Sequence, residues 1–301
     1  MLCSVAASAA ASSERCQLCG QAIHGDYVRF ETLDWDVCTA CASAPKCEAC
    51  ALPLAGTNEG DDGWCRRCLD AAPRCASCGR PIRERYWRVS GSEAMYCSRC
   101  KEDGNECSVC GAPDRVGRWV DGRWFCGSCS PRMVEDDSAQ WEGVYDLLVQ
   151  RAERELGLVL RVKPPLVIDD ASTLAERRAE QGAPPGLCGL YLRDAHGNAS
   201  IHVLSRLPAS RGAAVLAHEL AHAWQAENCP DDQGIRIREG FAEWVSWSLL
   251  DRWEDGDRER AVIEARTDEY GEGFRHFRRL AERSGVDYAI WYSKAARASI
   301  E

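Results

Sequence analysis

The segment SRGAAVLAHELAHAWQAE, residues 210–227, decides how the second half of the chain folds. Small and apolar side chains surround His218, Glu219 and His222, which predicts a buried helix beginning near Ser210. Residues four apart lie one turn above each other on a helix, so the two histidines can reach one zinc ion. Glu219 projects beside them, close to where a water on that ion would lie. The HExxH pattern also arises by chance, but unpartnered His and Glu are costly in so apolar a helix, so we predict a zinc site.

Two acidic residues that could complete this site follow in REGFAEW, residues 238–244, on a helix expected over about 235–252. Glu239 and Glu243 are four residues apart and face the same way. One can bind zinc while the other accepts the remaining ring N–H of a ligand histidine, and the spacing allows either assignment. Zinc peptidases with a glutamate as third ligand commonly use the first acidic residue of such a pair. That resemblance implies Glu239 as the ligand and Glu243 as the histidine's partner.

The elements expected around this helix make up a mainly helical domain over residues 138–300. Residues 138–157 place apolar side chains at spacings of three and four, which predicts an amphipathic helix. The sequence RVKPPLVIDD predicts a strand, and GLYLRDAHGNASIHVL predicts a hairpin in a small antiparallel sheet. The second strand of the hairpin, residues 199–204, is expected at the sheet edge, where an extended peptide could add as a further strand.

Sixteen of the nineteen cysteines lie in eight Cys-x-x-Cys pairs in the first half of the chain. This spacing aims two sulfurs at one ion, and two pairs complete a closed tetrahedral zinc site. A disulfide framework would require an oxidising compartment, and thioredoxin-like motifs need one pair per strand–helix fold. We therefore predict four structural zinc sites. The pairs are Cys16/Cys19, Cys38/Cys41, Cys47/Cys50, Cys65/Cys68, Cys75/Cys78, Cys97/Cys100, Cys107/Cys110 and Cys126/Cys129.

The cysteine pattern repeats after about 60 residues, which predicts two modules over residues 15–72 and 73–132. Each module would hold two zinc sites and take much of its folding free energy from them, because its apolar surface is small. The arrangement resembles tandem LIM domains, which serve as protein-binding surfaces. It differs in having Cys38 and Cys97 where LIM domains usually have His, and in a longer spacer between the two sites. Interleaved sites of the RING type are the competing arrangement.

Three separated motifs carry a closer resemblance, over roughly residues 140–280. They are the hairpin and helix up to HELAHAWQ, then REGFAEW, then DEYGEGFR at residues 268–275. In this order, behind LIM-like modules, they resemble the plant organ-size regulators of the DA-one type, which are LIM-containing zinc metallopeptidases. The resemblance implies an α+β chain whose second half is a zincin-type peptidase domain. It also implies a hydrogen-bond donor to the oxyanion beyond the third ligand, for which Tyr270 is the first candidate and His276 the second.

The function expected from these features is a zinc endopeptidase acting on protein substrates. One catalytic zinc would be held by His218, His222 and Glu239, with Glu219 as general base, and four structural zincs by the cysteines. The LIM-like modules would bind a protein partner or regulate the peptidase. The alternative is a non-catalytic adaptor with a metal-stabilised C-terminal domain, but such a scaffold needs the histidines and not Glu219. A zinc-dependent ligase would need interleaved cysteine sites.

Composition excludes other classes of function. The net charge of −10 over 301 residues is unsuited to general nucleic-acid binding, which needs a basic face. No stretch approaches the roughly 20 apolar residues of a membrane-spanning helix. Residues 1–14 are expected to form a disordered tail rather than a signal peptide. Cys3, Cys188 and Cys229 belong to no pair, and free thiols are typical of a reducing, cytoplasmic compartment.

Overall fold

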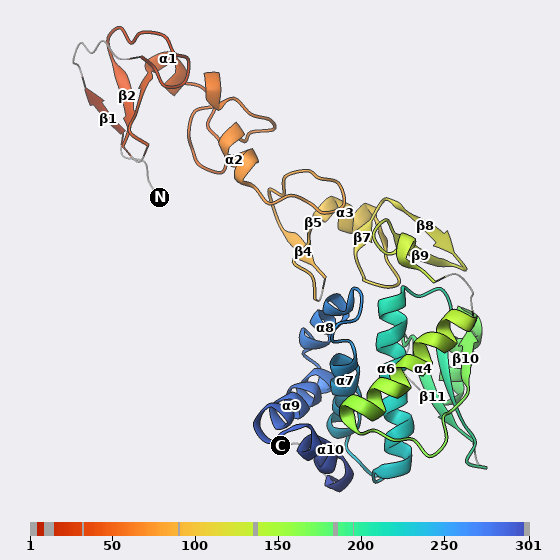
Figure 1. Ribbon diagram of the computed structural model, residues 1–301. Coiled ribbons are helices and arrows are strands. Elements are labelled where there is room, and N and C mark those ends of the chain that lie inside the picture. Colours follow the sequence, from red (N-terminus) through yellow and green to blue (C-terminus); the bar gives the residue numbers. More distant parts are fainter. Residues whose placement is uncertain are drawn as a thin grey trace. The chain divides into compact units, whose positions relative to one another are not determined.

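The computed structural model describes residues 5–8, 15–31, 33–89, 91–134, 138–182, 186–194 and 196–297. It divides into two compact units, Met1–Arg85 and Tyr86–Glu301. The fold is α+β, with small sheets and short helices around the cysteines and longer helices in the second half (Figure 1). None of the helices in these ranges combines the length and the hydropathy that crossing a membrane requires.

The first unit is a small sheet and short helices around cysteine loops. Its core contains few apolar side chains, among them Leu18, Phe30 and Val37, which pack around Cys16. So small a core supplies little free energy of folding, as expected for a module that depends on metal. The elements are β1 Val5–Ser8, β2 Tyr27–Phe30, β3 Trp35–Cys38, α1 Thr39–Ala42, the 3-10 helix η1 Gly56–Asn58 and α2 Arg66–Ala71.

Part of the segment expected to be a disordered tail is ordered backbone. Val5–Ser8 form β1, which pairs antiparallel with β2 in the order β1-β2-β3. The open edge of β2 explains this pairing, because its backbone N–H and C=O groups need partners. Residues 1–4 and 9–14, which include Cys3, lie outside the described residues.

The second unit begins with three short antiparallel hairpins. Their elements are β4 Tyr86–Arg88, β5 Met95–Cys97, α3 Ser98–Asp103, β6 Asn105–Glu106, β7 Pro113–Asp114, β8 Gly117–Val120, β9 Arg123–Cys126 and the 3-10 helix η2 Ser130–Arg132. The larger part that follows has one hydrophobic core beneath its long helices. Its helices are α4 Ser138–Leu156, α5 Ala171–Glu180, α6 Ala209–Asn228, α7 Ile235–Leu249, α8 Gly256–Glu264, α9 Glu269–Ser284 and α10 Val286–Ala295.

A three-stranded sheet packs on α6, in the order β10-β12-β11, and it corrects two expectations. The strands are β10 Leu166–Asp169, β11 Gly189–Arg193 and β12 Ala199–Leu204. The hairpin is antiparallel as predicted, but β10 runs parallel to β12, so the sheet is mixed. Among the described strands, β12 is central, and β10 and β11 are the two edges. Ile201 and Val203 of β12 are fully buried, which is why this apolar strand takes the centre of the sheet.

Helices α7 and α9 cross at two glycines. A Cβ added to Gly240 would lie 2.4 Å from the Gly273 backbone, and one on Gly273 would lie 2.0 Å from the Arg236 carbonyl oxygen. The backbones therefore approach more closely than any larger residue allows. This explains why positions 240 and 273 are glycines, and it brings the start of α9 next to the helix that carries Glu239.

The hairpins of the second unit pack directly on its helical part. Arg123 donates a hydrogen bond to the Ser205 carbonyl at 2.8 Å, and the Val134 amide donates to Leu207 at 2.9 Å. Between β4 and β5, Gly91 lies so close to α8 that an added Cβ would be 2.7 Å from the Val262 nitrogen. The cysteine pairs Cys107/Cys110 and Cys126/Cys129 thus belong to the same compact unit as the HExxH helix.

Candidate metal centres

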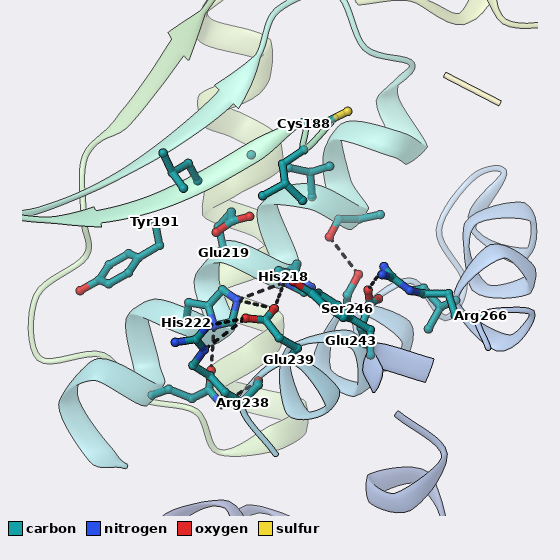
Figure 2. Close-up of a pocket in the computed structure, with 18 of the residues that line it drawn as sticks. Cys188, Tyr191, His218, Glu219, His222, Arg238, Glu239, Glu243, Ser246 and Arg266 are labelled. Atoms are coloured by element: carbon teal, nitrogen blue, oxygen red, sulfur yellow. Dashed lines mark hydrogen bonds and ion pairs between the residues drawn. The ribbon is translucent and has the colours of Figure 1, made fainter. Parts of the chain in front are cut away.

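Three side chains from two helices converge as the ligands of one ion would. Helix α6 presents His218 and His222 one turn apart, and α7 presents Glu239 (Figure 2). The two histidine Nε2 atoms are 3.1 Å apart, and each lies 3.3 Å from Glu239 Oε2. Zinc ligands 2.0–2.1 Å from the ion lie about 3.3–3.4 Å apart in a tetrahedron. The donor set and its spacing therefore fit a zinc ion, with Glu239 as the third member.

We call His218, His222 and Glu239 the cage. The charges around it favour a cation. Burial would raise the pKa of Glu239, but hydrogen bonds from His218 and His222 hold it well below its usual range. Burial would likewise lower the pKa of His218, but the bond to Glu239 and the nearby Glu243 and Glu219 raise it to about 9. Without metal, a proton on His218 thus supplies the positive charge that the carboxylates attract.

Glu219 lies between the cage and the edge strand β11, with Cys188 above it and Tyr191 to its left in the view of Figure 2. It is 8% exposed, and burial raises its pKa while His218 and His222 oppose the rise. Gly189 of β11 makes this approach possible. A Cβ there would lie 2.3 Å from Val215 and 3.0 Å from Glu219 Oε1. The carboxylate is therefore held against the backbone of a strand that is free to pair on its outer edge.

The structure brings Gln225, rather than Glu243, to a ligand histidine. Glu243 Oε1 accepts from Arg266 at 2.7 Å, whereas His222 Nδ1 lies 2.9 Å from Gln225 Oε1. Gln225 was not among the residues predicted for this site. The available signal was a polar residue on an apolar helix, three positions after a predicted ligand.

Tyr270 lies at the cage, and His276 does not. The Tyr270 ring stacks on His218 with ring centroids 6.5 Å apart, and the guanidinium carbon of Arg266 lies 4.3 Å from the centroid of the Tyr270 ring. Burial raises the pKa of Tyr270 to about 12, so its hydroxyl keeps its proton at neutral pH. His276 instead packs against the rings of Phe277 and Tyr292. Of the two candidate donors, only Tyr270 lines the cavity.

The cage opens into a cavity of about 960 Å³. Its walls are the cage residues, the β11 backbone, the segment from Arg266 to Tyr270, and α8. Helix α8 contributes Glu259, which pairs with Arg211 of α6 at 3.3 Å. A space of this size accommodates an extended peptide segment or a small ligand beside the cage.

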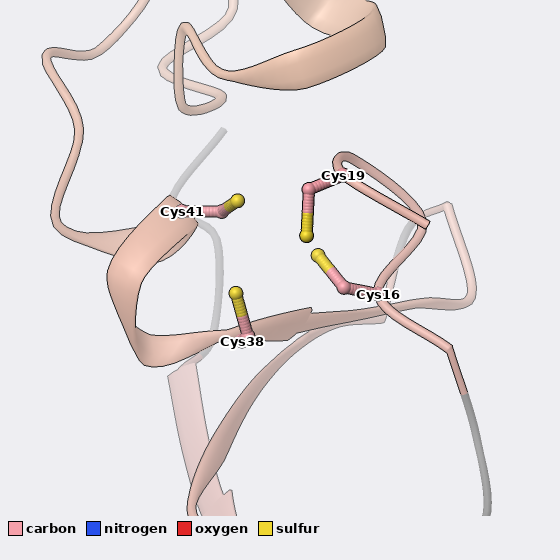
Figure 3. A group of neighbouring side chains, drawn as sticks. All are labelled: Cys16, Cys19, Cys38 and Cys41. Carbon is pink, nitrogen blue, oxygen red and sulfur yellow. The ribbon is translucent and has the colours of Figure 1, made fainter. Parts of the chain in front are cut away.

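Sixteen cysteines form four groups of four, each with its sulfur atoms within 4.8 Å of one another. In the first group, two sulfurs come from a loop, one from the end of β3 and one from α1 (Figure 3). The Cys50–Cys65 and Cys110–Cys126 sulfur pairs are 3.7 and 3.8 Å apart. Zinc–sulfur bonds of 2.3 Å place sulfurs about 3.8 Å apart in a tetrahedron. The groups are the predicted sequential ones: Cys16/19/38/41, Cys47/50/65/68, Cys75/78/97/100 and Cys107/110/126/129.

Backbone N–H groups stabilise thiolates in these sites. Burial would raise the pKa of Cys47, but amides led by those of Cys65 and Cys50 lower it to about 6. In the fourth group, the Arg258 guanidinium of α8 lies 3.6 Å from Cys129 Sγ. Among the described cysteines there is no disulfide, as expected if the pairs hold metal.

Comparisons of the chain with family models, with curated proteins and with solved structures gave no match.

Proposed function

We propose that this chain is a zinc-dependent endopeptidase of the DA-one type, acting on protein substrates in the cytoplasm. The observation that carries the proposal is the convergence of His218, His222 and Glu239 in a cavity that also holds the buried Glu219. The LIM-like cysteine modules would bind a partner or present the substrate. Cys188 and Cys229, the described cysteines outside the four groups, form no disulfide, which supports a reducing compartment.

A zinc ion held in this cage would act as a Lewis acid on the substrate carbonyl and on the attacking water. Glu219 would accept a proton from that water and deliver it to the leaving amine. The Tyr270 hydroxyl, which stays protonated, would donate to the oxygen on which negative charge develops. The peptide would lie along β11, hydrogen-bonded through its backbone, since β11 rather than β12 is the open edge above Glu219.

The position of Glu219 supports an enzyme over a metal-stabilised scaffold. A scaffold needs three ligands, and His218, His222 and Glu239 supply them. Burying a fourth ionisable group, Glu219, costs free energy, and holding a metal ion does not require that group. Its placement at the cavity, beside the cage, suits a general base.

Replacing Glu219 with Gln tests the proposal. We expect Glu219→Gln to lower the rate of peptide cleavage by about 10²–10⁴-fold, because the proton transfer is lost, with five zinc ions still bound. Peptide-library cleavage and metal analysis on the full chain measure the two quantities. Glu227→Gln is the matched control, since Glu227 lies on the same helix and accepts from the Arg161 backbone outside the cage. Equal cleavage by both variants would remove Glu219 from the mechanism.

A further inference from the structure

Gln225 is a buried amide on α6 that none of the roles above includes. It follows His222 by three residues and is 5% exposed. Its Oε1 lies 2.9 Å from His222 Nδ1, and its Nε2 donates to the backbone carbonyl of Arg238 at 3.0 Å. One side chain therefore joins a ligand histidine to the residue immediately before Glu239.

These two contacts determine the tautomer of His222. A backbone carbonyl oxygen can only accept, so the atom of Gln225 that faces Arg238 must be the amide nitrogen. The atom that faces His222 is then the amide oxygen, which also can only accept. The hydrogen bond therefore requires a proton on Nδ1, so a neutral His222 has its lone pair on Nε2. Nε2 is the atom that faces His218 and Glu239.

The same amide also connects the two ligand-bearing helices. His222 lies on α6 and Glu239 on α7, so their separation depends on how these helices pack. Gln225 bridges the two helices, because its amide oxygen faces the His222 imidazole on α6 and its amide nitrogen donates to the Arg238 carbonyl on α7. Being neutral, it orients the ring without adding another negative charge beside Glu239 and Glu219, which a carboxylate in its place would do.

We propose that Gln225 is a positioning residue of the metal centre. It holds His222 with Nδ1 protonated and Nε2 free to bind the ion, and it sets the distance between that imidazole and Glu239. This role rests on the zinc site of the proposed function, but it does not depend on peptide cleavage.

The test uses the full chain and two substitutions. Gln225→Leu keeps the size and removes both hydrogen bonds, whereas Gln225→Glu keeps an acceptor for the Nδ1 proton. Asn228→Leu is the control, because Asn228 is an amide on the same helix that bonds the Trp224 carbonyl and does not contact the cage. Imidazole nitrogen NMR after selective removal of the ion from the cage reads the tautomer of His222. Competition with a chelator measures zinc affinity, and a His222→Ala chain identifies which bound ion belongs to the cage.

We expect Gln225→Leu to lose the Nδ1-protonated form of His222 and to bind zinc at this site about 10–100-fold more weakly. Gln225→Glu should keep the tautomer but give an affinity between those of Gln225→Leu and the native chain, because the bond to the Arg238 carbonyl is still lost. Asn228→Leu should match the native chain. Native affinity in Gln225→Leu, or a neutral His222 with its proton on Nε2 in the native chain, would overturn the role. A native chain that binds only four ions would remove the metal centre and this role with it. Five ions without peptide cleavage would remove the peptidase function and leave Gln225 in its role.

Discussion

At the scale of single residues, the site is a set of charges arranged for an ion. His218 and Glu239 lie 3.3 Å apart and stabilise each other's charged forms when no metal is bound. Glu219 and Glu243 add to the negative potential at the same imidazole. Tyr270, stacked on His218, contributes a hydroxyl that does not ionise near neutrality. A metal ion that binds at this cage must therefore displace a proton.

The pH dependence of zinc binding follows from the raised pKa of His218. Because that pKa is about 9 without metal, His218 is protonated at neutral pH, and the ion must expel the proton. We expect affinity at this site to rise about tenfold per pH unit from pH 6.5 toward 9, instead of levelling off near the ordinary histidine pKa of about 6.5. Calorimetry in buffers of different ionisation enthalpy counts the protons, with a His218→Ala chain as the blank. Binding at pH 7.5 without release of about one proton would contradict this.

At the scale of elements, the crossing of α7 and α9 sets the position of Tyr270 relative to the cage. Gly240 and Gly273 let the backbones meet, so Tyr270, at the start of α9, comes next to the cage. The hydrogen bond from Gln225 to α7 acts at the neighbouring α6–α7 contact. The geometry of the site thus depends on two helix contacts, each made through a small or neutral residue.

A methyl group at the glycine crossing should separate the helices. We expect Gly273→Ala to lower the free energy of unfolding by about 1–3 kcal/mol, because the added Cβ would lie 2.0 Å from the Arg236 oxygen. Gly143→Ala is the control, since Gly143 is exposed on α4 with no atom within 4 Å of an added Cβ. That change should stabilise by about 0.5–1 kcal/mol, because alanine favours a helix interior. Denaturant unfolding measures both, and equal effects would refute the tight crossing.

At the scale of the whole molecule, the cysteine sites differ in what they support. The site of Cys107, Cys110, Cys126 and Cys129 lies in the same compact unit as the cage, and Arg258 of α8 reaches one of its sulfurs. Helix α8 is also a wall of the cavity. The site of Cys47, Cys50, Cys65 and Cys68 lies wholly within the other unit. Loss of these two zinc ions should therefore have different consequences.

Removing one ligand from each site separates these consequences. We expect Cys129→Ser to release one zinc and to lower the protection of α8 amides against hydrogen exchange, because Arg258 of α8 contacts this site at Cys129 Sγ. Cys65→Ser should also release one zinc but leave α8 protection unchanged. Hydrogen exchange with mass spectrometry, together with metal analysis, measures both effects. Unchanged α8 protection in Cys129→Ser would show that the helical part does not depend on this site.

Local spacing was enough to predict much of the chemistry. The Cys-x-x-Cys pairs and the two histidines of HELAH lie within one turn or one helix, so their geometry follows from the backbone alone. The α6 helix, the α4 helix and the β11–β12 hairpin were predicted for the same reason, since each is a periodic pattern within a short segment. The sequence by itself thus determined the types of ligand and the elements that carry them.

Only the tertiary structure decided how those elements meet. Glu239 and Glu243 are four residues apart, so both face the same side of α7. The packing of α7 on α6 brings Glu239 to the histidines, whereas Glu243 accepts a hydrogen bond from Arg266. The edge position of β11 and the partner of His222 likewise depend on contacts between segments far apart in the chain. Periodicity reports which face of an element is apolar, but not which neighbour covers it. That choice is made by the shapes and charges of surfaces that meet only after folding.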